Sequence, residues 1–230
     1  MIKCILFDFG YTLIYNVKHE VYTEVLKQAG KDNTLEEVSD AFLKADRHYM
    51  HYFPSLLMQL PICYLPAYIT TVNYYLGLFE PIMPFVKQYH TAMMMADPMW
   101  KVYDETRYTL SFLKDQGLKI GLVTNWGKDC RKVLTSVDLQ NYFDALIISD
   151  EIGIEKPDRR IFDIAVAKLG VTVHEALMIG DNYYDDGIGA TNAGMDYAII
   201  DRSGTADLSH CRTIKSLKDI PELLSLRDML

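Results

Sequence analysis

Short, largely apolar runs alternate with helical stretches through the second half of the chain, and this alternation constrains the fold more than any other feature. The runs occupy 118–123, 145–148, 176–179 and 197–200. Runs of this length are typical of buried strands, and strands that alternate with helices build a parallel sheet with helices on both faces. The sequence therefore predicts a doubly wound, Rossmann-like α/β core.

A further apolar run, 4–7, opens the chain and stops at Asp8. Open α/β sheets bind their ligands at the carboxyl ends of the strands, where Asp8 would lie. A single aspartate after a strand also often caps a turn, so Asp8 alone indicates little. The other elements expected in the core are helices at 104–116 and 127–137, helices that end near 169 and 193, a closing strand near Thr213 and a helix from Asp219.

A helical insertion separates the first strand from the others. Val17, Val21 and Val25 recur at four-residue spacing, and a capping-box signature at 34–37 predicts a second helix that runs to about 52. Breaks are expected at Pro54 and Pro61, and further helices from Pro66 to near Gly77 and from Pro84 to Met95. We predict an α/β core domain of residues 1–16 and 98–230 and an all-helical cap domain of residues 17–97.

The predicted cap domain is rich in Tyr, His and Met. Some of these side chains would line a substrate pocket if the domain selects the substrate. The alternative is that most of them pack a small helical core or face solvent, which is the commoner fate of any single aromatic residue. Aromatic content by itself does not name the substrate.

Composition limits the classes of function. The chain has 230 residues and a formal net charge of -8, which argues against a general nucleic-acid binder. No apolar run approaches the length of a membrane span, and the N-terminus lacks a signal-peptide pattern. The four cysteines have no metal-ligand spacing. We expect a cytoplasmic protein with reduced thiols, no membrane partner and either a monomeric or a homodimeric state.

Polar residues stand at the expected carboxyl ends of three strands: Asp8, Thr124 with Asn125, and Asp181. Lys156 lies in a loop that follows a fourth strand. If the sheet is parallel, these positions share one edge and converge. Two carboxylates, a hydroxyl and an ammonium group suit the binding of a phosphoryl group together with Mg²⁺. Each residue alone also has an ordinary structural explanation, as a cap, a turn former or a surface charge.

Four motifs then identify a family resemblance. DFGYT (8–12), LVTN (122–125), EKPD (155–158) and GDNYYDDGIGA (180–190) resemble, in this order, the motifs of the haloacid dehalogenase (HAD)-like hydrolase superfamily. The resemblance covers the whole chain, including a helical cap between the first and second motifs. It implies a phosphatase-type hydrolase that acts on a small phosphorylated metabolite with Mg²⁺ as cofactor.

The resemblance also implies roles for individual residues. Asp8 would attack phosphorus and form an aspartyl-phosphate, while Thr124 and Lys156 hold the phosphoryl oxygens and Lys156 steadies Asp8. Asp186, or less favourably Asp185, would support the metal ion directly or through water. The expected metal ligands are Asp8, Gly10 through its carbonyl, Asp181 and Asp186. The expected substrate contacts are Phe9, Gly10, Thr124, Asn125 and Lys156.

Gly10 departs from the phosphatase pattern. Relatives usually carry a second aspartate at this position, which acts as general acid and then as general base. Glycine has no proton to donate, and general acid–base assistance typically contributes about 10²–10⁴ in rate. The backbone carbonyl needed for the metal remains, so we expect metal binding to persist while protonation of the leaving group is lost.

Three functions are therefore compatible with the sequence. The first is a phosphatase whose leaving group needs little help or receives its proton from elsewhere. The second is a different hydrolytic chemistry, as in the dehalogenases or the phosphonatases, although Asp181 fits a metal site better than dehalogenase chemistry requires. The third is a low-activity or non-catalytic protein that binds a phosphorylated ligand.

Overall fold

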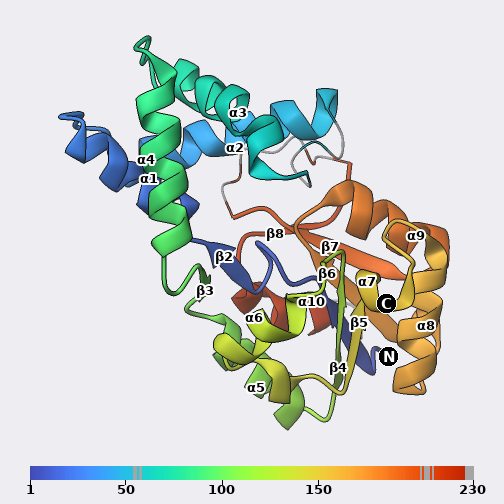
Figure 1. Ribbon diagram of the computed structural model, residues 1–230. Coiled ribbons are helices and arrows are strands. Elements are labelled where there is room, and N and C mark those ends of the chain that lie inside the picture. Colours follow the sequence, from blue (N-terminus) through green and yellow to red (C-terminus); the bar gives the residue numbers. More distant parts are fainter. Residues whose placement is uncertain (54–55, 57–58, 203, 205–207, 209, 226–230) are drawn as a thin grey trace. The chain divides into compact units, whose positions relative to one another are not determined.

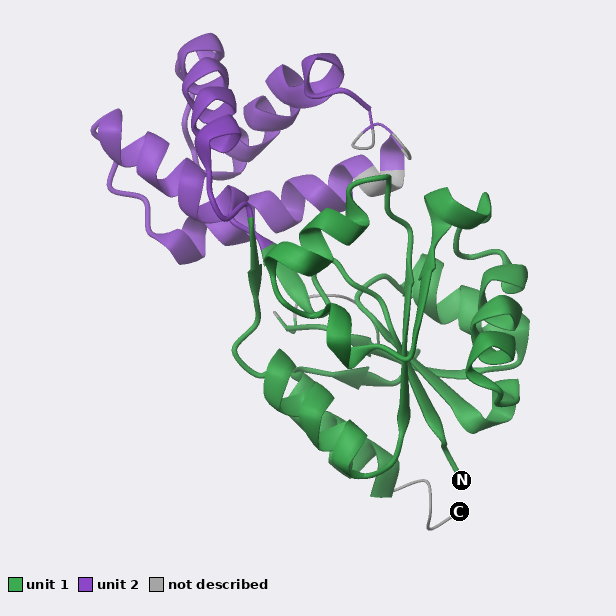
Figure 2. Cartoon of the chain, turned by 60° about the horizontal axis from the view of Figure 1, so that its bottom comes forward, with its two compact units in different colours: residues 1–15, 100–230 green, residues 16–99 purple. Residues whose placement is uncertain are grey.

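The computed structural model describes all residues except 54–55, 57–58, 203, 205–207, 209 and 226–230. At positions 50 and 51 it describes the backbone but not the side chains. The chain forms two compact units (Figure 2). One comprises residues 1–15 and 100–230, and the other comprises residues 16–99. The predicted helical segment, 17–97, begins one residue later and ends two residues earlier than the second unit. The break expected at Pro54 lies outside the described residues.

The first unit is built on a six-stranded sheet in which every strand pair is parallel (Figure 1). The strand order is β5-β4-β1-β6-β7-β8. Strand order reverses on the two sides of β1, and such a reversal is where doubly wound sheets bind ligands. The predicted fold class is confirmed. The strands are β1 (Cys4–Phe7), β4 (Lys119–Thr124), β5 (Ala145–Ile148), β6 (Ala176–Gly180), β7 (Asp196–Ile200) and β8 (Thr213–Ile214).

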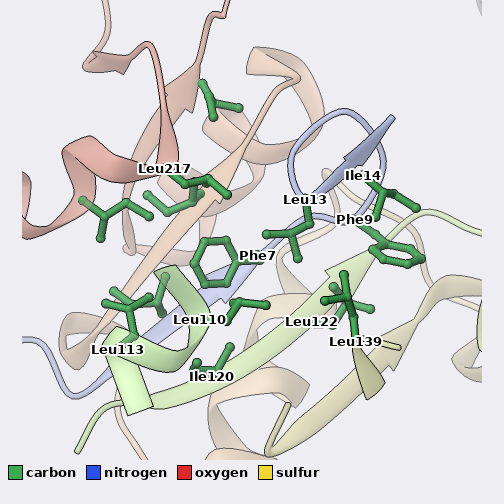
Figure 3. Packing of buried hydrophobic residues seen from close by; sticks show 14 of the residues in the cluster. Phe7, Phe9, Leu13, Ile14, Leu110, Leu113, Ile120, Leu122, Leu139 and Leu217 are labelled. Atoms are coloured by element: carbon green, nitrogen blue, oxygen red, sulfur yellow. The ribbon is translucent and has the colours of Figure 1, made fainter. Parts of the chain in front are cut away.

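Apolar side chains on both faces of the sheet form two separate cores. Successive residues of β1 alternate between them, because side chains of a strand point to opposite faces in turn. Ile5 and Phe7 join the core in which Leu110 and Leu122 also pack (Figure 3). Cys4 and Leu6 join the other, with Ile161, Phe162 and Met178. Burial on both faces explains why the strands are almost continuously apolar.

Helices of the first unit follow the strands closely. They are α5 (Thr106–Asp115), α6 (Cys130–Ser136), α7 (Ser149–Ile152), α8 (Arg159–Leu169), α9 (Gly189–Ala193) and α10 (Ile220–Ser225), with short helical turns η2 (Gln140–Tyr142), η3 (Val173–Glu175), η4 (Tyr183–Ile188, a π-helical turn) and η5 (Leu217–Asp219). Helix α6 begins three residues later than predicted, because 127–129 form the loop and turn that lead into it.

Within its described residues, the second unit contains the helices α1 (Lys18–Gln28), α2 (Leu35–Tyr52), α3 (Pro61–Tyr75) and α4 (Ile82–Met95). The capping box that the sequence predicts is present, since the Glu37 amide donates to Thr34 Oγ1 at 3.2 Å and the Thr34 amide donates to Glu37 Oε2 at 2.8 Å. Tyr22, Phe42 and Tyr68 pack in the core of this unit. Of the aromatic residues noted in the sequence, Tyr49, Tyr68 and Tyr89 are buried, whereas Tyr52 and Tyr74 are exposed.

Helix α3 and a small second sheet also differ from the prediction. Helix α3 begins at Pro61 and carries Pro66 inside it, although the sequence predicted a break at Pro61 and a start at Pro66. Proline is well suited to the first position of a helix, because the amide there has no intrahelical acceptor. The strands β2 (Ile14–Asn16) and β3 (Trp100–Val102), which form a separate two-stranded sheet, were also missed. Three residues are too few to show a strand periodicity.

Candidate active site

Asp8 follows β1 at the carboxyl end of the central strand. Its amide donates to the carbonyl oxygen of Ile179 at 2.9 Å, so pairing with β6 continues one residue beyond the strand. The residue is only 8% exposed. Asp8 therefore presents its carboxylate from a rigid backbone at the edge of the sheet where β4 and β6 also end.

Lys156 is buried and lies between two carboxylates. Its Nζ donates to Asp8 Oδ1 at 2.7 Å and to Asp186 Oδ1 at 2.6 Å. Asn125 holds the backbone of Lys156, because the Lys156 amide donates to Asn125 Oδ1 at 2.8 Å and Asn125 Nδ2 donates to the Lys156 carbonyl at 2.9 Å. The end of β4 and the loop before α8 are thus joined at this point. Thr124, the last residue of β4, is buried beside Asn125.

Thr12 joins the two strand ends that flank the reversal of strand order. Its Oγ1 lies 3.5 Å from Asp8 Oδ2 and 3.5 Å from Asp181 Oδ1. The two carboxylates therefore converge on one buried hydroxyl, as the shared sheet edge predicted. Thr12 belongs to the motif DFGYT, but no role was predicted for it from the sequence. The feature of the sequence that could have indicated this role is the position of Thr12, four residues after Asp8.

Asp186 is positioned by the π-helical turn η4. Its Oδ2 accepts from the Asn182 amide at 3.1 Å, and its Oδ1 accepts from Lys156. A Cβ at Gly180 would lie 2.0 Å from Asp186 Oδ2, so only glycine leaves room for this carboxylate. Asp185 has a different partner, because its Oδ2 accepts from Asn182 Nδ2 at 3.3 Å. The structure thus places Asp186, and not Asp185, against Lys156.

The carboxylates and the ammonium group shift one another's pKa. Burial, reinforced by the charges of Asp8 and Asp186, holds the pKa of Asp181 well above its usual range. Burial also raises the pKa of Asp186, to about 6, although Lys156 opposes the shift. Burial alone would lower the pKa of Lys156, but Asp186 and Asp8 outweigh it and raise that pKa. Three carboxylates around one ammonium group leave an excess of negative charge, which favours a bound cation.

Candidate metal ligands at this edge are oxygen atoms, the type that Mg²⁺ prefers. They are the carboxylates of Asp8 and Asp181 and the carbonyl of Gly10. Within the described part of the chain, no group of three or more His, Cys, Asp or Glu side chains is disposed to hold a metal ion by itself. Magnesium sites commonly combine one or two carboxylates with water and substrate phosphate. The donor set therefore fits Mg²⁺ as part of a site that other oxygens complete.

Four aromatic side chains form a series of ring contacts, and one of them, Trp126, lies against Gly10. The ring centroids of Phe9 and Trp126 are 5.1 Å apart, those of Trp126 and Trp100 are 4.8 Å apart, and those of Trp100 and Tyr11 are 6.1 Å apart. A Cβ at Gly10 would lie 3.2 Å from Trp126 Cζ3. We call Tyr11, Trp100 and Trp126 the aromatic cluster. This cluster was not predicted, since its members come from three separate segments of the sequence.

The match to a family profile now identifies the chain. The profile described as haloacid dehalogenase-like hydrolase covers residues 5–200. The chain belongs to this family. The resemblance noted in the four motifs is thereby confirmed, and the protein is a member of a family of hydrolases.

Known HAD-like relatives include two named glyceraldehyde 3-phosphate phosphatase. The protein from Pyrococcus abyssi is 27% identical over 209 residues, which are 85% of this chain and 79% of the relative. The protein from Methanothermobacter thermautotrophicus is 34% identical over 104 residues, so the match spans 43% of this chain and only 44% of that relative.

Solved structures of HAD-like proteins extend the comparison. A HAD phosphatase from Thermococcus onnurineus has 25% identity and a TM-score of 0.61, with 97% of this chain and 98% of that chain covered. The putative HAD-hydrolase YfnB from Bacillus subtilis, solved bound to magnesium, has 16% identity and a TM-score of 0.66 over the same shares of the two chains. This second likeness shows the fold alone.

Among the described helices, none combines the length and apolar character needed to cross a bilayer.

Proposed function

We propose that the protein is a magnesium-dependent phosphatase that hydrolyses a small phosphomonoester through an aspartyl-phosphate on Asp8. The observation that carries the proposal is the pairing of Lys156 Nζ with Asp8, at 2.7 Å, beside a second carboxylate, Asp181, that shares the Thr12 hydroxyl with Asp8. The proposed nucleophile, the ammonium group of Lys156 and a candidate metal ligand thus lie at one sheet edge. The names of the relatives from Pyrococcus and Methanothermobacter support the phosphatase assignment.

In the proposed reaction, Asp8 Oδ2 attacks phosphorus while Lys156 holds Oδ1 of the same carboxylate. Lys156 and the Thr124 hydroxyl would also bind phosphoryl oxygens, on which negative charge must be stabilised. Asp186 and Asn125 act as positioning residues, because the first holds the ammonium group of Lys156 and the second holds its backbone. Asp186 uses both oxygens on protein donors, which favours an indirect role toward a metal ion.

Mg²⁺ would be held by Asp8, Asp181 and the carbonyl of Gly10, and when bound it would supply positive charge to the phosphoryl oxygens. Gly10 supplies no acid for the leaving group. Phe9 and Gly10 contribute backbone to the loop that carries the nucleophile. We further propose that the helical unit, 16–99, is the cap domain that selects the substrate, since it is inserted between the first and second motifs.

The test is hydrolysis of p-nitrophenyl phosphate with and without Mg²⁺. Asp8→Asn should abolish the activity, whereas Asp115→Asn, an exposed aspartate at the end of α5, should leave it unchanged. Chloride release from a haloacid without metal would instead indicate a dehalogenase. Magnesium-dependent binding of inorganic phosphate without turnover of any activated ester would indicate a phospholigand-binding protein.

A further inference from the structure

We propose that the aromatic cluster beside Gly10 binds the leaving group of the substrate, and that the preferred substrates are aryl phosphates. This inference rests on the proposed phosphatase function and adds a substrate class to it. It joins two observations, the absence of an acid at Gly10 and the presence of a partly exposed ring, that of Trp126, in its place.

The ring of Trp126 covers the place from which a side chain at residue 10 would project. A Cβ there would be 3.2 Å from Trp126 Cζ3, closer than most real Cβ contacts. Trp126 is itself held in place, because its Nε1 donates to Asp129 Oδ1 at 3.2 Å and its amide donates to Ser149 Oγ at 3.1 Å. A preorganised aromatic face therefore stands where other family members would present a carboxylic acid.

Tyr11 adds evidence that the cluster has a function. Its φ is +58°, in the left-handed region that glycine adopts freely and that side chains with a Cβ disfavour. Apart from Asp138, it is the one non-glycine residue with positive φ in the described part of the chain. The tyrosine ring nevertheless occupies this position and contacts Trp100 edge-on. Strain retained beside a candidate catalytic residue points to a role for the side chain.

Trp100 and Trp126 pack against the apolar core that contains Phe7, but no member of the aromatic cluster is fully buried. Phe9 is fully buried, whereas Tyr11, Trp100 and Trp126 each remain partly exposed. All of these residues belong to the same compact unit as Asp8, so the cluster and the nucleophile are placed by one fold. Offset or edge-on contact with such rings favours a flat apolar group over a polyhydroxylated one.

The chemistry of an aryl leaving group agrees with the missing acid. An Asp8 oxygen bonds to phosphorus as the bond from phosphorus to the aryl oxygen breaks, and the bonding pair leaves on that oxygen. A phenol has a pKa of about 10, so the phenolate departs without a proton from the protein and takes one from solvent. Water then attacks phosphorus and releases the Asp8 carboxylate. One proton of that water stays on the phosphate, and the other restores the proton taken from solvent.

Fluorescence offers a direct binding test. The chain has two tryptophans, Trp100 and Trp126, and both lie in the aromatic cluster. In the magnesium-loaded wild-type protein, phenylphosphonate, which has no hydrolysable ester bond, should change the tryptophan emission at concentrations at which methylphosphonate does not. Equal responses to the two phosphonates would show that the ring is not recognised.

Kinetics separate this inference from the proposed function. Phenyl phosphate carries a ring, while acetyl phosphate has an activated leaving group without one. Trp126→Leu should lower kcat/KM for phenyl phosphate relative to acetyl phosphate about five- to tenfold, through KM, and Trp126→Phe should recover most of the loss. Tyr108→Leu, which removes an exposed ring on α5, serves as the matched control.

The possible results distinguish the two proposals. If neither ester is hydrolysed in a magnesium-dependent way, both the proposed phosphatase function and the aromatic assignment are contradicted. Hydrolysis of both esters with the same ratio in Trp126→Leu, in Trp126→Phe and in the wild type would overturn the aromatic assignment alone. A fall in the ratio that phenylalanine reverses, together with the selective fluorescence response, would support it.

Discussion

Lys156 places one ammonium group between two buried carboxylates, at 2.7 Å from Asp8 and 2.6 Å from Asp186. Its removal leaves like charges facing each other without a counterion. Lys156→Met should therefore abolish phosphatase activity and destabilise the α/β unit by about 3–5 kcal/mol at neutral pH. Urea unfolding measures the loss of stability. The control is Arg159→Met, which breaks an exposed Arg159–Asp163 pair and should change the unfolding free energy by less than about 1 kcal/mol.

The effect of a substitution at Gly10 should depend on the residue at position 126, because the two positions are in contact. Gly10→Asp alone should gain little on ethyl phosphate, because the new side chain meets the Trp126 ring. With Trp126→Leu added, the acid has room, and kcat/KM for ethyl phosphate should rise about 10²-fold over Trp126→Leu alone, at the lower end of general-acid assistance. The rise on p-nitrophenyl phosphate should be much smaller, since that leaving group needs no proton. Equal gains on both esters would contradict our account of Gly10.

The single residues at the site differ in how far the sequence revealed them. The motifs pointed to Asp8, Lys156 and Asp181, because residue type and position relative to the predicted strands can be read directly from the sequence. The sequence did not reveal that Asn125 grips the Lys156 backbone, nor that Thr12 touches two carboxylates. These roles depend on which loops meet in space. The aromatic cluster was hidden for the same reason.

At the scale of elements, η4 packs so closely against the end of β6 that Gly180 has no room for a side chain. A Cβ at Gly180 would lie 2.0 Å from Asp186 Oδ2. Gly180→Ala should displace the turn, deprive Lys156 of one of its partners and lower kcat at least tenfold, with a lower melting temperature. Gly127→Ala is the matched control, because its nearest neighbour would be 3.8 Å from the new Cβ. Similar kcat values for the two variants would show that η4 can shift to accommodate the new side chain without loss of activity.

Elements were predictable where periodicity and burial agree. The five longer strands of the main sheet and the capping box of α2 followed from local pattern. Helix α3 did not, because proline at 66 suggested a boundary while the apolar positions 65, 69 and 72 continued through it into the core. Tertiary burial overrode the local preference there. The strands β2 and β3 pair with each other in a separate two-stranded sheet. Segments of three residues are too short for the sequence to show such pairing.

At the scale of the whole molecule, the two compact units respond to acid through different groups. In the α/β unit, Asp181 and Asp186 have raised pKa values, so acid favours their protonated folded forms. In the helical unit, burial and the neighbouring charge of Lys18 lower the pKa of His19 to about 4, although Asp46 opposes the shift. His19 Nε2 is buried without a hydrogen-bond partner. Its ring lies 5.0 Å from that of Phe42.

The consequence for His19 follows from linkage. The unfolded chain binds a proton near the ordinary histidine pKa of about 6.5, whereas the folded unit resists it until about pH 4. The neutral histidine is therefore tolerated above pH 6.5, and stability is lost as the pH falls from 6.5 toward 4, by about 2–3 kcal/mol. His19→Gln should remove this loss, and His90→Gln, at an exposed position of α4, should not. Denaturant unfolding at pH 7 and pH 4.5 measures the difference between the variants, and the same acid response in both would show that His19 titrates normally in the folded protein.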